Sequence, residues 1–287
     1  MKKNKGIMYI VMSAFCFAVM NVFVKLSGDI PSMQKSFFRN LVALVFAYFI
    51  IRKSMEGFHF KKENLPFLLI RSVCGTVGIL CNFYAVDHLM LSDASMLSKL
   101  SPFFAIIFSL FFLKEKASLF QWLAIIIAFL GSLFIIKPSF ANPSLIPSLI
   151  GVAGAMGAGA AYTTVRYLGT KGERGPLIVF FFSTFSCLAV APFVLFDFHP
   201  MTWLQLTYLL LAGLSAAGGQ FAITAAYTYA PAKELSVYDY SQILFSAVFG
   251  FILFNQIPDQ YSFIGYFIIF GISLIMFIRQ NKNKQFA

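Results

Sequence analysis

The stretches LMLSDASMLSKLSPF (residues 89–103) and APAKELSVYDYSQIL (residues 230–244) reveal an internal repeat, because they align at a separation of 141 positions. The same shift extends well beyond them. It aligns Leu68-Leu69 with Leu209-Leu210, Gly78 with Gly219, Asp93 with Glu234, Ser95 with Ser236, Phe104 with Phe245, Phe129 with Phe270 and Lys25 with Arg166. The chain therefore divides into two units, residues 1–141 and residues 142–287.

Both units are too apolar to belong to a soluble protein. Hydrophobic residues make up 59% of the 287 residues and charged residues 11%, and the mean hydropathy is +0.80. A soluble domain carries about a quarter charged residues, because most residues of a globule of this size still touch water. The composition excludes a disordered chain, a coiled coil and an ordinary soluble enzyme, and it indicates a polytopic membrane protein.

Apolar runs of the length that crosses a bilayer, roughly 20 residues, recur along the chain. They predict helices over residues 7–26, 33–51, 65–86, 90–113, 119–136, 145–168, 176–196, 203–228, 233–254 and 260–278. Each unit then holds five spans, an odd number, so the second unit is inserted upside down. We predict an all-α membrane protein of ten transmembrane helices in two inverted five-helix repeats, a plan typical of secondary transporters.

The positive charges predict the orientation. Of the 22 lysines and arginines, fifteen lie on one set of alternating loops and tails, while Lys25, Lys35 and Lys137 lie on the other set. Cytoplasmic loops carry such an excess of basic residues. We therefore expect a multi-pass protein of the inner (cytoplasmic) membrane with both termini in the cytoplasm. The net charge of +11 is explained in this way, and no nucleic-acid partner is expected.

Short motifs in a fixed order resemble a known family. They are Phe37-Phe38-Arg39-Asn40, then residues 89–95, Leu100-Ser101-Pro102-Phe103, Leu113-Lys114-Glu115-Lys116 and the second-unit copy at residues 230–236. Over residues 7–278 the chain resembles the EamA family of the drug/metabolite transporter superfamily. The resemblance implies a ten-helix carrier, typically an exporter of amino acids or other small metabolites. It implies a cavity among spans 1–4 and 6–9, with spans 5 and 10 peripheral and available for a homodimer contact. The second unit departs from the pattern, with Gln256 in place of Glu115 and Ile243 in place of Pro102.

Ionisable residues inside the spans are the first candidates for a substrate site, because such residues are costly in a bilayer and normally face the bundle interior. Lys99 and Asp239 lie near the bilayer centre on spans that the repeat relates to each other. We expect them to meet, either directly or through the substrate. The alternative is a fixed structural ion pair. Arg39 and Arg71 lie nearer to the two faces, where a long basic side chain can also reach the headgroups.

A zwitterion would suit such a site. Lys99 would bind a carboxylate, and Asp239 would bind an ammonium group or a proton, which makes it the coupling residue. Further polar and aromatic candidates for the same substrate site are Asn21, Asn82, Gln220, Tyr84, Tyr238 and Tyr240. The alternatives are interhelical hydrogen bonds for the amides and chance proximity for the tyrosines, since 18% of the chain is aromatic.

These residues predict a secondary transporter that exports a small polar metabolite, an amino acid or related zwitterion, by alternating access. An importer of a cationic amine such as choline, held by Asp239 and tyrosines, is the rival in the same fold. A membrane enzyme acting on lipid is disfavoured, because no acid, base or metal residues cluster near one interface. We expect no catalytic residue, metal or cofactor, and the expected partners are the substrate and membrane lipid.

Overall fold

The computed structural model describes residues 2–54, 57–112, 118–137, 142–229, 235 and 238–285. Throughout these ranges the regular secondary structure is helical and contains no strand. The helices are α1 (Lys2–Leu26), α2 (Ser32–Lys53), the 3-10 turn η1 (Lys62–Asn64), α3 (Leu65–His88), α4 (Leu91–Ser98), α5 (Ser101–Phe112), α6 (Leu119–Ile136), α7 (Leu145–Thr170), α8 (Gly175–Phe196), α9 (Trp203–Tyr229), α11 (Ser241–Phe254) and α12 (Gln260–Gln285).

Eight helical segments within the described ranges are long and apolar enough to cross a membrane, and they coincide with the first eight expected spans. The last two expected spans correspond to shorter apolar segments, Ser241–Phe254 and Gln260–Met276. Residues 230–234 and 236–237, where the ninth expected span begins, lie outside the described residues. For the residues that it describes, the structure thus confirms a helical protein with many candidate membrane spans.

The fourth expected span is not one continuous helix, as the apolar run over 90–113 had predicted. It breaks into α4 and α5 at Lys99 and Leu100. Pro102 explains the break, because proline has no N–H to donate to the carbonyl of Ser98 and its ring clashes with that carbonyl. The break therefore places a charged residue, Lys99, at an irregular point in the middle of the bundle.

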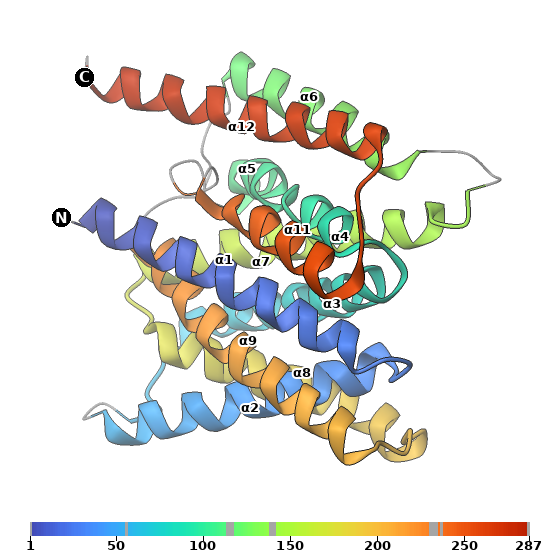
Figure 1. Ribbon diagram of the computed structural model, residues 1–287. Helices are drawn as coiled ribbons and strands as arrows, with labels where there is room; N and C mark the ends of the chain where they lie inside the picture. Colours follow the sequence, from blue (N-terminus) through green and yellow to red (C-terminus); the bar gives the residue numbers. More distant parts are fainter. Residues whose placement is uncertain are drawn as a thin grey trace.

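Helices from the two units pack against each other in pairs. The most extensive contacts are those of α1 with α9, α3 with α7, α2 with α8, and α6 with α12. In Figure 1, α6 and α12 lie side by side at one edge of the molecule, and α2 lies at the opposite edge. Large side chains of α6 remain exposed, among them Leu119, Trp122, Ile126 and Leu130, as expected of a face that contacts lipid.

Glycines allow α3 and α7 to come unusually close. A Cβ atom at Gly157 would lie 2.8 Å from the backbone oxygen of Cys74, and one at Gly78 would lie 3.1 Å from the backbone nitrogen of Ala158. Small residues at such contacts let two helix backbones approach, which is a common way for membrane helices to associate. This contact holds the cavity-lining face of α3 in position.

Candidate substrate-binding site

A cavity of about 90 Å³ lies in the interior of the bundle, between the helices of the two units. Seven of the residues predicted for the substrate site line it: Asn21, Arg39, Arg71, Asn82, Lys99, Gln220 and Asp239. They come from α1, α2, α3, the α4–α5 break, α9 and the residues just before α11. The cavity therefore brings together candidates that lie more than 200 positions apart in sequence.

Lys99 and Asp239 form a direct ion pair, which is one of the two arrangements expected from the sequence. The distance from Lys99 Nζ to Asp239 Oδ2 is 2.8 Å, and the two side chains are 5% and 3% exposed. Lys99 Nζ also donates a hydrogen bond to Gln242 Oε1 at 2.7 Å. The second oxygen, Asp239 Oδ1, is buried and has no hydrogen-bond partner in the part of the chain that the structure describes. Within those residues it is an unused acceptor at the cavity, and the use of the pair by a substrate stays a prediction.

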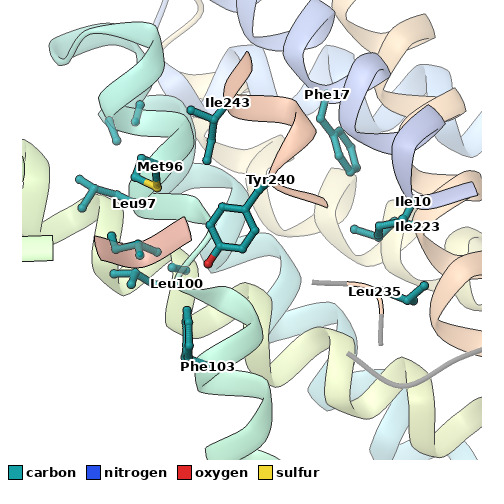
Figure 2. Close-up of a cluster of buried hydrophobic side chains, with 14 of the residues drawn as sticks. Ile10, Phe17, Met96, Leu97, Leu100, Phe103, Ile223, Leu235, Tyr240 and Ile243 are labelled. Carbon is teal, nitrogen blue, oxygen red and sulfur yellow. The ribbon is translucent and has the colours of Figure 1, made fainter. Parts of the chain in front are cut away.

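Tyr240 stabilises the helix break and does not line the cavity. Phe103 N donates to Leu100 O, so the carbonyl of Lys99 is left without its helical partner. The hydroxyl of Tyr240 donates to that carbonyl at 3.1 Å. Figure 2 shows the Tyr240 ring among the apolar side chains that surround the break, with its hydroxyl directed toward Leu100 and Phe103. Tyr240 thus fixes the backbone that carries Lys99.

Arg39 and Arg71 are buried side chains that face the cavity. Each is 2% exposed, so neither reaches the surface in the way that the headgroup interpretation required. Both lie over the ring of Phe182, with the guanidinium carbon 5.6 Å from the ring centroid for Arg39 and 4.0 Å for Arg71. A cation over an aromatic face is attracted by the negative charge density of the ring.

The two arginines differ in their hydrogen bonds. Arg39 Nη1 donates to Asn40 Oδ1 at 2.5 Å, and its Nη2 donates to Gln220 Oε1 at 3.3 Å. Arg71 makes no hydrogen bond with any residue that the structure describes, and the Nε atoms of both arginines are buried without partners. The ion pairs of the described ranges involve Lys35, Lys99 and Lys137, so neither arginine has a carboxylate partner there.

Gly75, one turn after Arg71 on α3, provides the space for the Arg71 guanidinium group. A Cβ atom at Gly75 would overlap Arg71 Nη1 and would lie 2.9 Å from Phe182 Cε2. Any larger residue at this position therefore displaces either the guanidinium group or the ring. The position of Arg71 over Phe182 depends on this missing side chain.

The amide side chains line the cavity and also bond to each other across helices. Asn82 Nδ2 donates to Asn21 Oδ1 at 3.5 Å, which links α3 to α1. Gln220 Nε2 donates to Thr224 Oγ1 at 3.3 Å, while its oxygen accepts the bond from Arg39. The interhelical bonding and the cavity position are thus both present, and binding of a substrate by these amides stays a prediction.

The other two predicted tyrosines, like Tyr240, lie away from the cavity lining. Tyr84 stacks on His88 at the end of α3, with ring centroids 4.1 Å apart. Tyr238 is also absent from the residues that line the cavity. Sequence reasoning missed Phe182, which does not stand out among 37 phenylalanines. It also missed Gln242, although a polar residue three positions after Asp239 in an apolar span was a detectable signal.

Comparisons with known proteins show which family the chain resembles. The chain is 31% identical to the Pseudopaline exporter CntI of Pseudomonas aeruginosa over 264 residues, which cover 91% of this chain and 92% of the relative. Residues 4–137 match the EamA-like transporter family. The chain belongs to the EamA family.

More distant relatives of this EamA protein are also carriers by name. Human Solute carrier family 35 member G1 is 28% identical, covering 90% of this chain and 74% of the relative. A solved crystal structure aligns over 94% of this chain and 98% of its own, with a TM-score of 0.65 and 12% identity, and so shares the fold. The protein is therefore a multi-pass membrane transporter of the drug/metabolite transporter superfamily.

Proposed function

We propose that this protein is a secondary transporter that exports a small polar metabolite of the amino-acid class across the cytoplasmic membrane. One observation carries the proposal: among the described residues, a single cavity holds both a carboxylate oxygen without a partner, Asp239 Oδ1, and two guanidinium groups without carboxylates, Arg39 and Arg71. An amino acid offers an ammonium group to the first and a carboxylate to the second. Buried polar groups of this kind are normally satisfied, and the substrate would satisfy them.

The charges of the cavity argue against the rival, an importer of a purely cationic amine such as choline. Arg39, Arg71 and Lys99 line the cavity together with Asp239, so the described part of its lining carries three cations and one carboxylate. Charges so close together in a region of low dielectric repel a cation strongly. A substrate with at least one carboxylate is favoured instead.

The proposed plan is ten spans in two inverted repeats with both termini in the cytoplasm, and the helix contacts support the repeat. The 141-residue shift relates α1 to α7 and α3 to α9, and the contact of α1 with α9 recurs as the contact of α7 with α3. The shift also relates α2 to α8 and α6 to α12, and each of these pairs is in contact. The exposed outer faces of α6 and α12 support the proposed homodimer contact there.

Equivalent cations at the ends of α1 and α7 support alternating access between these repeats. Lys25 Nζ donates to the carbonyl of Val86 at 2.9 Å. Its counterpart Arg166 donates to the equivalent carbonyl, that of Tyr227, at 3.5 Å. The same type of contact is thus tight in one unit and loose in the other, as expected if the two faces of a carrier close in turn.

In the proposed cycle, Asp239 exchanges the substrate for a proton. The ionised carboxylate binds the ammonium group of the substrate at Oδ1 while Oδ2 holds Lys99. A proton arriving from outside neutralises Asp239, removes the attraction for the ammonium group and releases the substrate. Loss of that proton to the cytoplasm then restores the site. The break at Lys99 places the pair where discontinuous helices commonly hold substrates and coupling ions.

Counterflow in proteoliposomes tests this proposal. Liposomes loaded with unlabelled glutamine or serine should accumulate the same labelled amino acid, and a pH gradient should drive net transport. Asp239→Asn should abolish the response to the gradient, whereas Asp259→Asn, which changes an exposed carboxylate outside the cavity, should keep it.

The double variant Lys99→Gln/Asp239→Asn keeps the net charge of the cavity. It replaces the single variant in this test if Asp239→Asn alone does not fold. It too should fail to respond to the gradient. Gradient-driven transport by either Asp239 variant would show that Asp239 is not the coupling residue. The absence of counterflow for every amino acid would refute the proposed function.

A further inference from the structure

We infer that the substrate carries at least two carboxylates, one bound by Arg39 and the other by Arg71. The inference rests on the proposed function and narrows its substrate class, from amino acids in general to dicarboxylate members of that class. It follows from the charge, the burial and the free hydrogen-bond donors of the two arginines.

The charge balance of the cavity is the first argument. Lys99 and Asp239 neutralise each other at 2.8 Å, which leaves the two arginines without carboxylates in the part of the chain that the structure describes. A guanidinium group stays protonated in proteins, so the two charges cannot be removed by loss of a proton. Uncompensated charge in a membrane interior is costly. One monocarboxylate would balance only one of the two.

The free donors are the second argument. Arg71 uses none of its N–H groups on the described residues, and Arg39 keeps its Nε unused after bonding Asn40 and Gln220. Arginine presents a planar fork that binds a carboxylate through two parallel hydrogen bonds. Both forks lie in the lining of one cavity, so a single small molecule can reach both of them.

Phe182 explains how the positive charges of Arg39 and Arg71 can lie close together before the substrate binds. Its ring lies against both guanidinium groups, at 5.6 and 4.0 Å from the two guanidinium carbons. The ring offers an attraction to cations without a negative charge that would have to leave when a carboxylate binds. The arginines are therefore held in place and yet remain available to an anion.

Matched pairs of ligands test the inference on the purified full-length protein in lipid nanodiscs. The probes are glutamate with glutamine, and glutarate with glutaramate, since each pair exchanges one carboxylate for an amide of similar size. Affinity follows from ligand-dependent stabilisation, because a ligand that binds only the folded state raises its stability by mass action. Each dicarboxylate should bind about 10–100 times more tightly than its amide partner, as expected for one charge-assisted contact.

Variants then assign the preference to the arginines. Arg71→Gln should lower the affinity for glutamate far more than the affinity for glutamine and so remove the preference, and Arg71→Lys, which keeps the charge but loses the fork, should reduce the preference. Arg166→Gln removes a guanidinium group outside the cavity lining and should leave the preference intact. Because the readout is a ratio of affinities in one folded sample, a general loss of stability does not imitate it.

The outcomes separate this inference from the proposed function. Equal affinity for glutamate and glutamine would overturn the dicarboxylate inference and leave amino-acid transport standing. A preference for glutarate without binding of either amino acid would support the inference and overturn the proposed function. O-Phosphoserine binding more tightly than glutamate would overturn the two-carboxylate form in favour of one carboxylate and one phosphate dianion, and no binding by any probe would overturn both proposals.

Discussion

The substitution Asp239→Asn removes the carboxylate that faces three cations across one cavity. In the described residues the lining then carries Arg39, Arg71 and Lys99 with no anion, so its charge rises from +2 to +3. Lys99→Gln has the opposite effect and lowers the charge to +1. Both variants break the ion pair of 2.8 Å, yet the first should destabilise the fold more than the second.

The size of the effect follows from the geometry. At 2.8 Å and an effective dielectric constant of about 20, two unit charges attract each other by about 6 kcal/mol. Desolvation of the pair offsets much of this, and removal of one partner from a buried pair typically costs about 3–5 kcal/mol. We expect a cost in this range for Asp239→Asn and a smaller one for Lys99→Gln. The double variant returns the charge to +2 and should recover part of the loss.

Thermal unfolding in detergent, followed by intrinsic fluorescence, measures these differences. For a chain of this size a loss of 3 kcal/mol corresponds to a fall in Tm of roughly 10 °C. The four proteins form a double-mutant cycle, and residues in direct contact should show a coupling free energy of about 2 kcal/mol. A larger loss for Lys99→Gln than for Asp239→Asn, or a cycle without coupling, would refute the charge argument.

Two glycine substitutions test the packing around the cavity, with Gly271→Ala as their control because nothing lies within 4 Å of a Cβ atom there. Gly75→Ala should displace the guanidinium group of Arg71 and weaken glutamate binding by about tenfold, while Tm stays near that of the control, since a flexible side-chain end can move. An unchanged affinity in a binding titration would contradict the assigned role of Arg71. Gly157→Ala should instead lower stability by about 1–3 kcal/mol, because its Cβ atom would lie 2.8 Å from the backbone oxygen of Cys74. A Tm equal to that of the control would show that this close approach of helices is not needed.

The meeting of the two central charges was predictable from the sequence. The repeat put Lys99 and Asp239 on symmetry-related spans, a few ångströms to either side of the expected bilayer centre, and the two side chains form the expected direct pair at 2.8 Å. The boundaries of most helices also followed from the apolar runs. The break of the fourth span was missed, although Pro102 was visible, because apolar runs continue across a broken helix.

Hydropathy and charge along the chain by themselves determined the class of protein, the number of apolar segments and the set of polar residues that the membrane has to accommodate. Only the tertiary structure decided which of them share a cavity. Arg71 on α3 and Phe182 on α8 meet because Gly75 leaves room for the guanidinium group, whereas Tyr84 on the same helix turns away to His88. The rotation of a helix about its own axis depends on contacts with helices far away in sequence, and an apolar segment with aromatic residues on every side leaves that rotation open.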